Sequence, residues 1–134
     1  MADTIKLRVV TPIKPVIDEE VDEVVAPGEL GEFGVLPGHT PLISTLAPGE
    51  LTYKKGGVEK TILIEGGVAD VRDDLVNVLA DNVISIDEVD YEATRKDAED
   101  ILEEIKNFGE NRKGFKALER RLKITELKLR VKRT

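Results

Sequence analysis

The spacing of apolar residues changes near residue 88, from a period of two to a period of seven. Before that point Ile5, Leu7 and Val9 alternate with polar residues, and later segments repeat this alternation. Such a pattern indicates β-strands with one buried face. After that point apolar residues recur every three or four positions, as on one face of an α-helix. The sequence therefore predicts an all-β sandwich over residues 1–88, followed by an antiparallel α-helical hairpin over residues 89–134.

Turn residues divide the first part into short strands, as in a sandwich. Residues 51–54 and 61–64 flank a Lys-Lys-Gly-Gly turn and predict a β-hairpin. Residues 75–79 are apolar at nearly every position, which predicts a strand inside the sandwich rather than at its edge. The pentapeptide Ala-Pro-Gly-Glu-Leu occurs at 26–30 and again at 47–51. Its Pro-Gly pairs predict two type II turns.

Two apolar stripes define the helical part. Asp90 is the expected N-cap of the first helix. The first stripe comprises Thr94, Ala98, Ile101, Ile105 and Phe108, and the second comprises Phe115, Leu118, Leu122, Thr125 and Leu129. Stripes with a seven-residue repeat, joined by a Gly-containing loop, predict a hairpin held by one narrow seam. Since a lone hairpin of this kind is marginally stable, we expect it to dock on another surface. Ile124 and Leu127 lie off the seam and predict an apolar strip that faces away from the first helix.

Charge is distributed unevenly along the chain. The net charge is −7 overall, but residues 1–88 carry −10 while residues 111–134 carry ten basic and two acidic residues, or +8. A basic end on an acidic protein indicates an acidic contact, which could be the protein's own first part, a partner protein, nucleic acid or a membrane surface. A solvated helix face is the simpler alternative, because exposed charge pairs contribute little energy.

The residues needed for most enzyme chemistry are missing. The chain has no cysteine, one histidine, and neither a phosphate-binding glycine loop nor a His-Glu-x-x-His motif. The acidic cluster at residues 18–23 would be splayed to both faces of a strand, and we expect no metal site there. We interpret His39 as a hydrogen-bonded loop residue rather than a catalyst. The sequence predicts a protein that is not an enzyme and has no cofactor.

Two features bear on location and on alternative functions. No apolar stretch approaches the roughly 20 residues that cross a bilayer, and no secretory signal is evident, which favours a reducing, cytoplasmic compartment. An alternative function is a stand-alone sandwich that binds an acidic polymer through its basic end. Phe115 is the only aromatic residue in the basic helix. Stacking on nucleic-acid bases is therefore weakly supported.

One segment resembles a known family. Residues 31–43, Gly-Glu-Phe-Gly-Val-Leu-Pro-Gly-His-Thr-Pro-Leu-Ile, are similar to the signature loop of the epsilon subunits of bacterial F-type ATP synthases. The resemblance continues through residues 64–67 and 76–81 into the helical hairpin. It implies a non-catalytic rotor subunit that couples ion-driven rotation of the c-ring to ATP synthesis through the gamma subunit. It also implies that the C-terminal helices inhibit ATP hydrolysis.

The resemblance further implies residue roles and a location. Glu32 corresponds to the contact with the c-ring, and His39 to the part of the loop that faces gamma. The protein would be peripheral on the cytoplasmic face of the bacterial inner membrane, with no membrane insertion and no nucleic-acid partner. The basic end would contact acidic segments of the catalytic alpha/beta head through Arg112, Lys113, Lys116, Arg120, Arg121 and Lys123.

One departure from the family concerns nucleotide binding. Some members bind ATP through the pattern Ile/Leu-Asp-x-x-Arg-Ala at the start of the first helix, where this chain reads Val-Asp-Tyr-Glu-Ala-Thr. Asp90 matches the aspartate, but Ala93 occupies the arginine position. Arg95 lies two residues further on, about 200° around the helix, and cannot replace it. We therefore expect ATP binding to be weak or absent.

Overall fold

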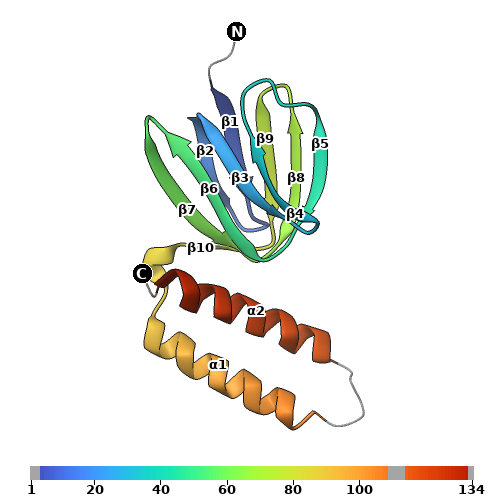
Figure 1. The fold of residues 1–134 in the computed structure, drawn as a ribbon, viewed down its shortest axis with the longest axis vertical. Coiled ribbons are helices and arrows are strands. Elements are labelled where there is room, and N and C mark those ends of the chain that lie inside the picture. Colours follow the sequence, from blue (N-terminus) through green and yellow to red (C-terminus); the bar gives the residue numbers. More distant parts are fainter. Residues whose placement is uncertain (1–3, 109–113, 133–134) are drawn as a thin grey trace. The chain divides into compact units, whose positions relative to one another are not determined.

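The computed structural model describes residues 4–108 and 114–132 and divides the chain into two compact units, Met1–Ile84 and Ser85–Thr134 (Figure 1). The boundary falls four residues before the position suggested by the sequence pattern. The described residues form ten β-strands, one short 3-10 helix and two α-helices. The predicted fold class, a β-sandwich followed by a helical hairpin, is confirmed.

The ten strands form one hydrogen-bonded sheet that folds over on itself. In chain order they are β1 (Ile5–Val10), β2 (Pro15–Val21), β3 (Glu23–Gly28), β4 (Gly31–Val35), β5 (Leu42–Leu46), β6 (Gly49–Lys55), β7 (Val58–Ile64), β8 (Gly67–Arg72), β9 (Leu75–Ala80) and β10 (Val83–Ile84). Their order across the sheet is β10-β7-β6-β3-β5-β8-β9-β1-β2, with β4 paired to β3. Strands β1 and β9 are parallel, and the other pairs are antiparallel.

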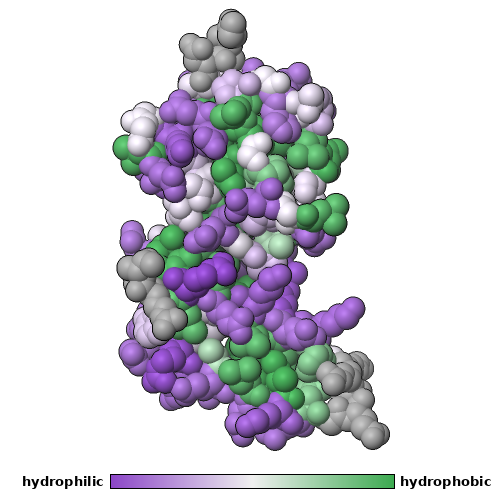
Figure 2. Space-filling model, viewed as in Figure 1, coloured by the Kyte–Doolittle hydropathy of each residue, from purple (hydrophilic) through white to green (hydrophobic). Residues whose placement is uncertain are grey.

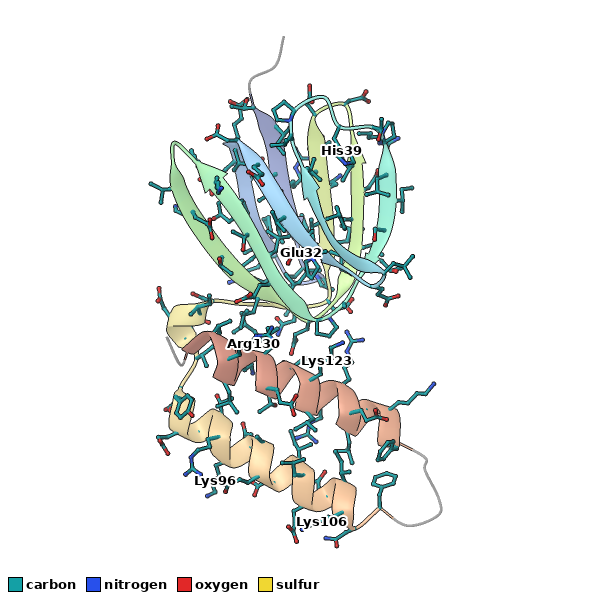
Figure 3. The ribbon with its side chains drawn as sticks, viewed as in Figure 1. Glu32, His39, Lys96, Lys106, Lys123 and Arg130 are labelled. Carbon is teal, nitrogen blue, oxygen red and sulfur yellow. The ribbon has the colours of Figure 1, made fainter. Side chains whose placement is uncertain are left out.

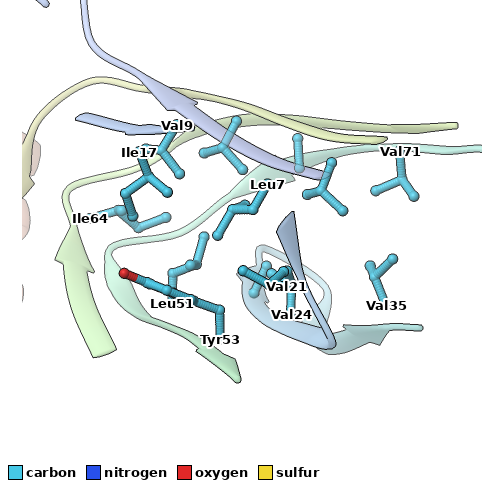
Figure 4. Packing of buried hydrophobic residues seen from close by; sticks show 14 of the residues in the cluster. Leu7, Val9, Ile17, Val21, Val24, Val35, Leu51, Tyr53, Ile64 and Val71 are labelled. Carbon is cyan, nitrogen blue, oxygen red and sulfur yellow. The ribbon is translucent and has the colours of Figure 1, made fainter. Parts of the chain in front are cut away.

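Alternation along each strand builds the core of this unit. In β1, Ile5, Leu7 and Val9 are almost completely buried, while Lys6 between them is exposed. Partners from several strands fill the interior, including Val21, Val24, Val35, Leu51, Ile64 and Val71 (Figure 4). A core of this size can stabilise the unit by itself, because burial of each large apolar side chain contributes about 1.5–3 kcal/mol.

Two predictions about individual strands are confirmed. Strands β6 and β7 form the expected hairpin, and Gly56 and Gly57 adopt positive φ angles of 57° and 81° at its turn. This is the conformation that a two-residue hairpin turn requires. Strand β9 lies between β8 and β1, as expected of a strand inside the sandwich.

The predicted type II turns at the two Ala-Pro-Gly-Glu-Leu copies are wrong. Gly28 ends β3 and Gly49 begins β6, and neither has a positive φ. The two copies instead contact each other, since the Ala47 amide donates to the Pro27 carbonyl oxygen at 2.8 Å. A Cβ atom on Gly49 would lie only 2.7 Å from the Cβ atom of Pro27. A Cβ atom on Gly28 would likewise lie 2.6 Å from the Gly31 carbonyl oxygen, so the structure favours glycine at both positions because neighbouring atoms lie close, not because the chain turns there.

The second unit contains η1 (Ile86–Glu88), α1 (Tyr91–Lys106) and α2 (Phe115–Lys132). Asp90 caps α1 as predicted, with its side chain accepting a hydrogen bond from the Ala93 amide at 3.1 Å. The predicted helical hairpin is confirmed (Figure 1). Its buried seam consists of Thr94, Ala98, Ile101, Leu118 and Thr125.

Near the bend of the hairpin, the rings of Phe108 and Phe115 meet edge to face with centroids 5.5 Å apart. Ile124 and Leu127, the apolar strip expected on α2, occupy helix positions outside this seam. Among the described helices, none is long and apolar enough to cross a membrane.

Candidate partner-binding surfaces

Glu32 is the second residue of β4 and lies opposite Pro27 of β3. Its side chain is exposed and lines a shallow hollow of about 230 Å³. Glu23 and Glu59 also line this hollow, together with Lys54, whose Nζ lies 3.8 Å from the Glu23 carboxylate. Three carboxylates against one ammonium make the hollow acidic, which suits a contact with polar or basic loops.

His39 lies in the loop between β4 and β5. The His39 amide donates to the Leu36 carbonyl oxygen at 3.1 Å, which closes a turn around Pro37 and Gly38. The His39 Nδ1 atom lies 2.6 Å from the carbonyl oxygen of Thr40. Glu32 and His39 lie apart, one near the start of β4 and the other beyond its end (Figure 3). The structure therefore does not bring these two predicted residues into one site.

A row of exposed apolar side chains crosses the outer face of β5, β8 and β9. Val68 is paired with Leu79 across β8 and β9, and with Thr45 on β5, two residues from Ile43. Ile43, Val68 and Leu79 are 73%, 38% and 60% exposed. We call these three residues the apolar row. Apolar side chains reach the surface on the β5 side of the strand unit (Figure 2).

Sequence reasoning did not identify the apolar row as a surface. The sequence signal for it is the apolar character of residues 75–79 on both faces, which predicts a strand inside the sandwich rather than an exposed surface. Strand β9 is indeed central within the sheet, yet the side chain of Leu79 points outward. A sequence cannot show whether the second apolar face of a strand is covered by the same chain or by a partner.

Basic residues of α2 recur at helical spacing on a face outside the seam. We call Lys116, Arg120, Lys123 and Arg130 the basic stripe, because their spacings of four, three and seven place them on one side of the helix. Lys123 and Arg130 lie on the side of α2 away from α1 (Figure 3). Arg121 lies on the flank of the hairpin, 3.9 Å from the Glu104 carboxylate of α1. The predicted contacts Arg112 and Lys113 lie outside the described residues.

The start of α1 is occupied by local interactions. The Asp90 carboxylate serves as the helix cap, and Arg95 pairs with Glu92 and Glu99 on its own helix. Ala93 is exposed and offers no donor at the position where the ATP-binding pattern has arginine. The expectation of weak ATP binding stays a prediction.

The pKa of Tyr53 is shifted where β6 contacts β2. Lys55 Nζ lies 3.1 Å from the Glu19 carboxylate, which also accepts a hydrogen bond from the Tyr53 hydroxyl. Burial raises the pKa of Tyr53, and the negative charge of Glu19 and the hydrogen bond to it raise it further. These contacts join β2 to β6 and have a structural role.

Similarity to known proteins establishes the family to which this chain belongs. Residues 4–86 match the family described as "ATP synthase, Delta/Epsilon chain, beta-sandwich domain". The ATP synthase epsilon chain of Geotalea uraniireducens is 40% identical over 131 residues, which cover 98% of this chain and 95% of the relative. That of Syntrophobacter fumaroxidans is 46% identical and covers 94% and 98%. The chain belongs to the ATP synthase epsilon chain family. It is a non-catalytic subunit of the F1 part of the enzyme.

Solved structures agree with the family. A chain in a structure of the Euglena gracilis mitochondrial ATP synthase, titled OSCP/F1/c-ring, superposes with a TM-score of 0.85 and 27% identity, covering 95% of this chain and 80% of that one. A chain from the central stalk and c-ring of the Tetrahymena thermophila enzyme superposes with a TM-score of 0.67 at 15% identity, which supports the fold. This chain therefore shares its fold with chains solved within assembled ATP synthases.

Proposed function

We propose that the strand unit binds the gamma subunit through the apolar row and the adjoining loop at His39. It contacts the c-ring near Glu32 and thereby transmits rotation between them. The apolar row carries this proposal, because contiguous exposed apolar side chains on a central part of a sheet mark a protein-binding surface. The similarity to a chain solved with F1 and the c-ring supports the choice of partners. On this proposal the protein is peripheral on the cytoplasmic face of the bacterial inner membrane.

Binding of the full-length chain to purified gamma subunit tests the strand unit. Leu79→Asp places a charge in the apolar row and should weaken binding at least 30-fold, as loss of a buried interface anchor does. Val58→Asp is the matched control, since Val58 is 57% exposed against 60% for Leu79 and lies on β7, outside the row. Equal affinity of the two variants would exclude the apolar row as the binding surface.

We further propose that the helical unit restrains ATP hydrolysis by placing the basic stripe against acidic segments of the catalytic head. The charge separation supports this function, because α2 presents its exposed cations at helical spacing and α1 is predominantly acidic. Removal of residues from Asp90 onward should raise ATP hydrolysis by the assembled complex and leave its assembly and ATP synthesis largely unchanged. Unchanged hydrolysis would contradict the proposal.

A charge-neutral variant separates the basic stripe from the hairpin as a whole. Glutamine at all four positions of the basic stripe should reproduce most of the increase in hydrolysis that the truncation causes. Hydrolysis by the complex with the truncated chain should also depend less on salt than hydrolysis by the wild-type complex, because the screened contact is absent. Lys96→Gln with Lys106→Gln on α1 is the matched control and should leave hydrolysis unchanged.

An ATP titration of the isolated chain, followed by calorimetry, tests the prediction that ATP binds weakly or not at all; a micromolar dissociation constant would refute it.

A further inference from the structure

The turn between β8 and β9 holds two consecutive residues in the left-handed region of backbone conformation. Asp73 has φ 50° and Asp74 has φ 57°, and neither is glycine. Turns of this shape favour Asn-Gly or Asp-Gly, because glycine adopts positive φ without steric cost. Strain of this kind persists where surrounding interactions hold it, and it often marks a functional constraint.

The side chain of Asp74 makes a contact far away in the sequence. Its Oδ1 atom accepts a hydrogen bond from the Gly38 amide at 2.7 Å, across 36 residues of chain. Its backbone carbonyl accepts from the Lys6 amide at 2.9 Å, which anchors the turn to β1. Asp74 therefore joins three segments: β1, the β8–β9 turn and the loop that precedes β5.

The Gly38 amide is the group that most needs this contact. His39 N and Leu36 O close the turn at residues 36–39, and Gly38 has φ 82° at its second corner. In a turn of this type the amide of the second corner points outward, away from the closing hydrogen bond. A carboxylate acceptor makes a stronger bond than a neutral one. The Asp74 carboxylate thus fixes the orientation of the peptide that joins Pro37 to Gly38.

We infer that Asp74 is a positioning residue, which holds the Pro37–Gly38–His39 turn in the shape that gamma recognises. The inference rests on the proposed function, in which this loop contacts gamma. Asp73 has the same backbone conformation, but the bond to Gly38 comes from Asp74. The positive φ at residue 74 is accepted because a side chain is needed there, and glycine would supply none.

Three variants of the full chain separate the side chain from the strain. Asp74→Gly relieves the backbone and removes the acceptor, Asp73→Gly relieves the backbone and keeps it, and Asp74→Asn keeps a neutral acceptor oxygen. Amide hydrogen exchange at Gly38, followed by NMR, should be about fivefold faster in Asp74→Gly, the factor that corresponds to one net hydrogen bond. It should stay within twofold of wild type in Asp73→Gly and lie between wild type and Asp74→Gly in Asp74→Asn, because a neutral oxygen accepts a weaker bond. Equal exchange in the two glycine variants would overturn the inference.

Affinity for purified gamma provides the second measurement. Asp74→Gly should bind gamma about fivefold more weakly, Asp73→Gly should bind like the wild type, and Asp74→Asn should bind with an affinity between these two. Faster Gly38 exchange with unchanged affinity would overturn the positioning role. Failure of the wild-type chain to bind gamma would overturn the proposed function and this role with it, and that failure is seen before any variant is compared.

Discussion

The two units of this protein bury their side chains in different ways. The strand unit encloses large aliphatic residues from most of its strands, such as Leu7, Leu51 and Ile64, with almost no exposed surface. Between its two helices the helical unit has one narrow seam, in which two of the buried positions are Thr94 and Thr125. The Thr125 hydroxyl is satisfied by the Arg121 carbonyl oxygen at 2.7 Å, so it packs without an unpaired polar group.

This difference suits the two units to different functions. A unit with a filled core is rigid and can present the apolar row and the His39 loop in a fixed arrangement. A hairpin with one narrow seam opens at a lower free energy, as elements that switch between states generally do. We therefore expect the strand unit to stay bound to gamma and the c-ring, and the helical unit to switch between conformations.

The largest expected effect is in the strand unit. Gly67 has φ 146°, and a Cβ atom added there would overlap the carbonyl oxygen of Leu79 on β9. Gly67→Ala should therefore lower the free energy of unfolding by about 4 kcal/mol, since the clash and the backbone strain add. Gly57→Ala is the control, because its φ of 81° is also unfavourable but its Cβ atom would meet nothing within 4 Å. Urea unfolding should show a loss of only about 1–2 kcal/mol for the control.

A core substitution in the helical unit tests whether the units are independent. Ile101→Ala should lower the free energy of opening, measured at the α1 and α2 amides, by about 2–3 kcal/mol, because it leaves a cavity in the seam. Hydrogen exchange should show the strand amides unaffected. Leu102→Ala is the matched control, since Leu102 is 50% exposed on the same turn, and it should change stability by less than about 0.5 kcal/mol. Equal loss of protection in both units would contradict the independence of the hairpin.

A smaller effect concerns the start of α1. Asp90→Ala removes the hydrogen bond to the Ala93 amide and should destabilise the hairpin by about 1 kcal/mol. Circular dichroism at 222 nm should show helix melting at a lower temperature, with the strand transition unchanged. Asp90→Asn retains a capping oxygen and should behave like the wild type; if it melts as early as Asp90→Ala, the cap is not the cause.

The smallest effect is a pH dependence confined to the strand unit. The pKa of Tyr53 is raised in the folded state, so folded protein keeps the phenol proton to higher pH than unfolded protein. The resulting stability is complete below the unfolded pKa of about 10 and is lost as pH rises through the folded pKa. Urea unfolding between pH 8 and 11 should show a decline that Tyr53→Phe makes shallower. Glu19→Gln should reduce the decline in part, since it removes the neighbouring charge; an identical decline in all three proteins would contradict this origin.

Patterns of local spacing were sufficient to predict much of the fold. Alternation predicted β1, the Gly-Gly pair predicted the β6–β7 hairpin, and the two heptad stripes predicted α1 and α2. These predictions succeed because each depends on residues that are neighbours within one element. The Ala-Pro-Gly-Glu-Leu copies failed for the opposite reason: Gly49 is needed because Pro27 lies against it, and that contact joins distant segments.

The candidate surfaces divide in the same way. Their chemical identity, such as the charge of Glu32 and of the basic stripe, is present in the sequence, as is the family resemblance of residues 31–43. The sequence thus determined several of the strands, both helices, their charges and the family. Only the tertiary structure decided that Leu79 faces outward, that Glu32 and His39 lie apart, and that Asp74 holds the Gly38 amide. These are contacts and exposures between segments distant in the chain, and the periodicity of a single segment carries no information about which other segment lies beside it.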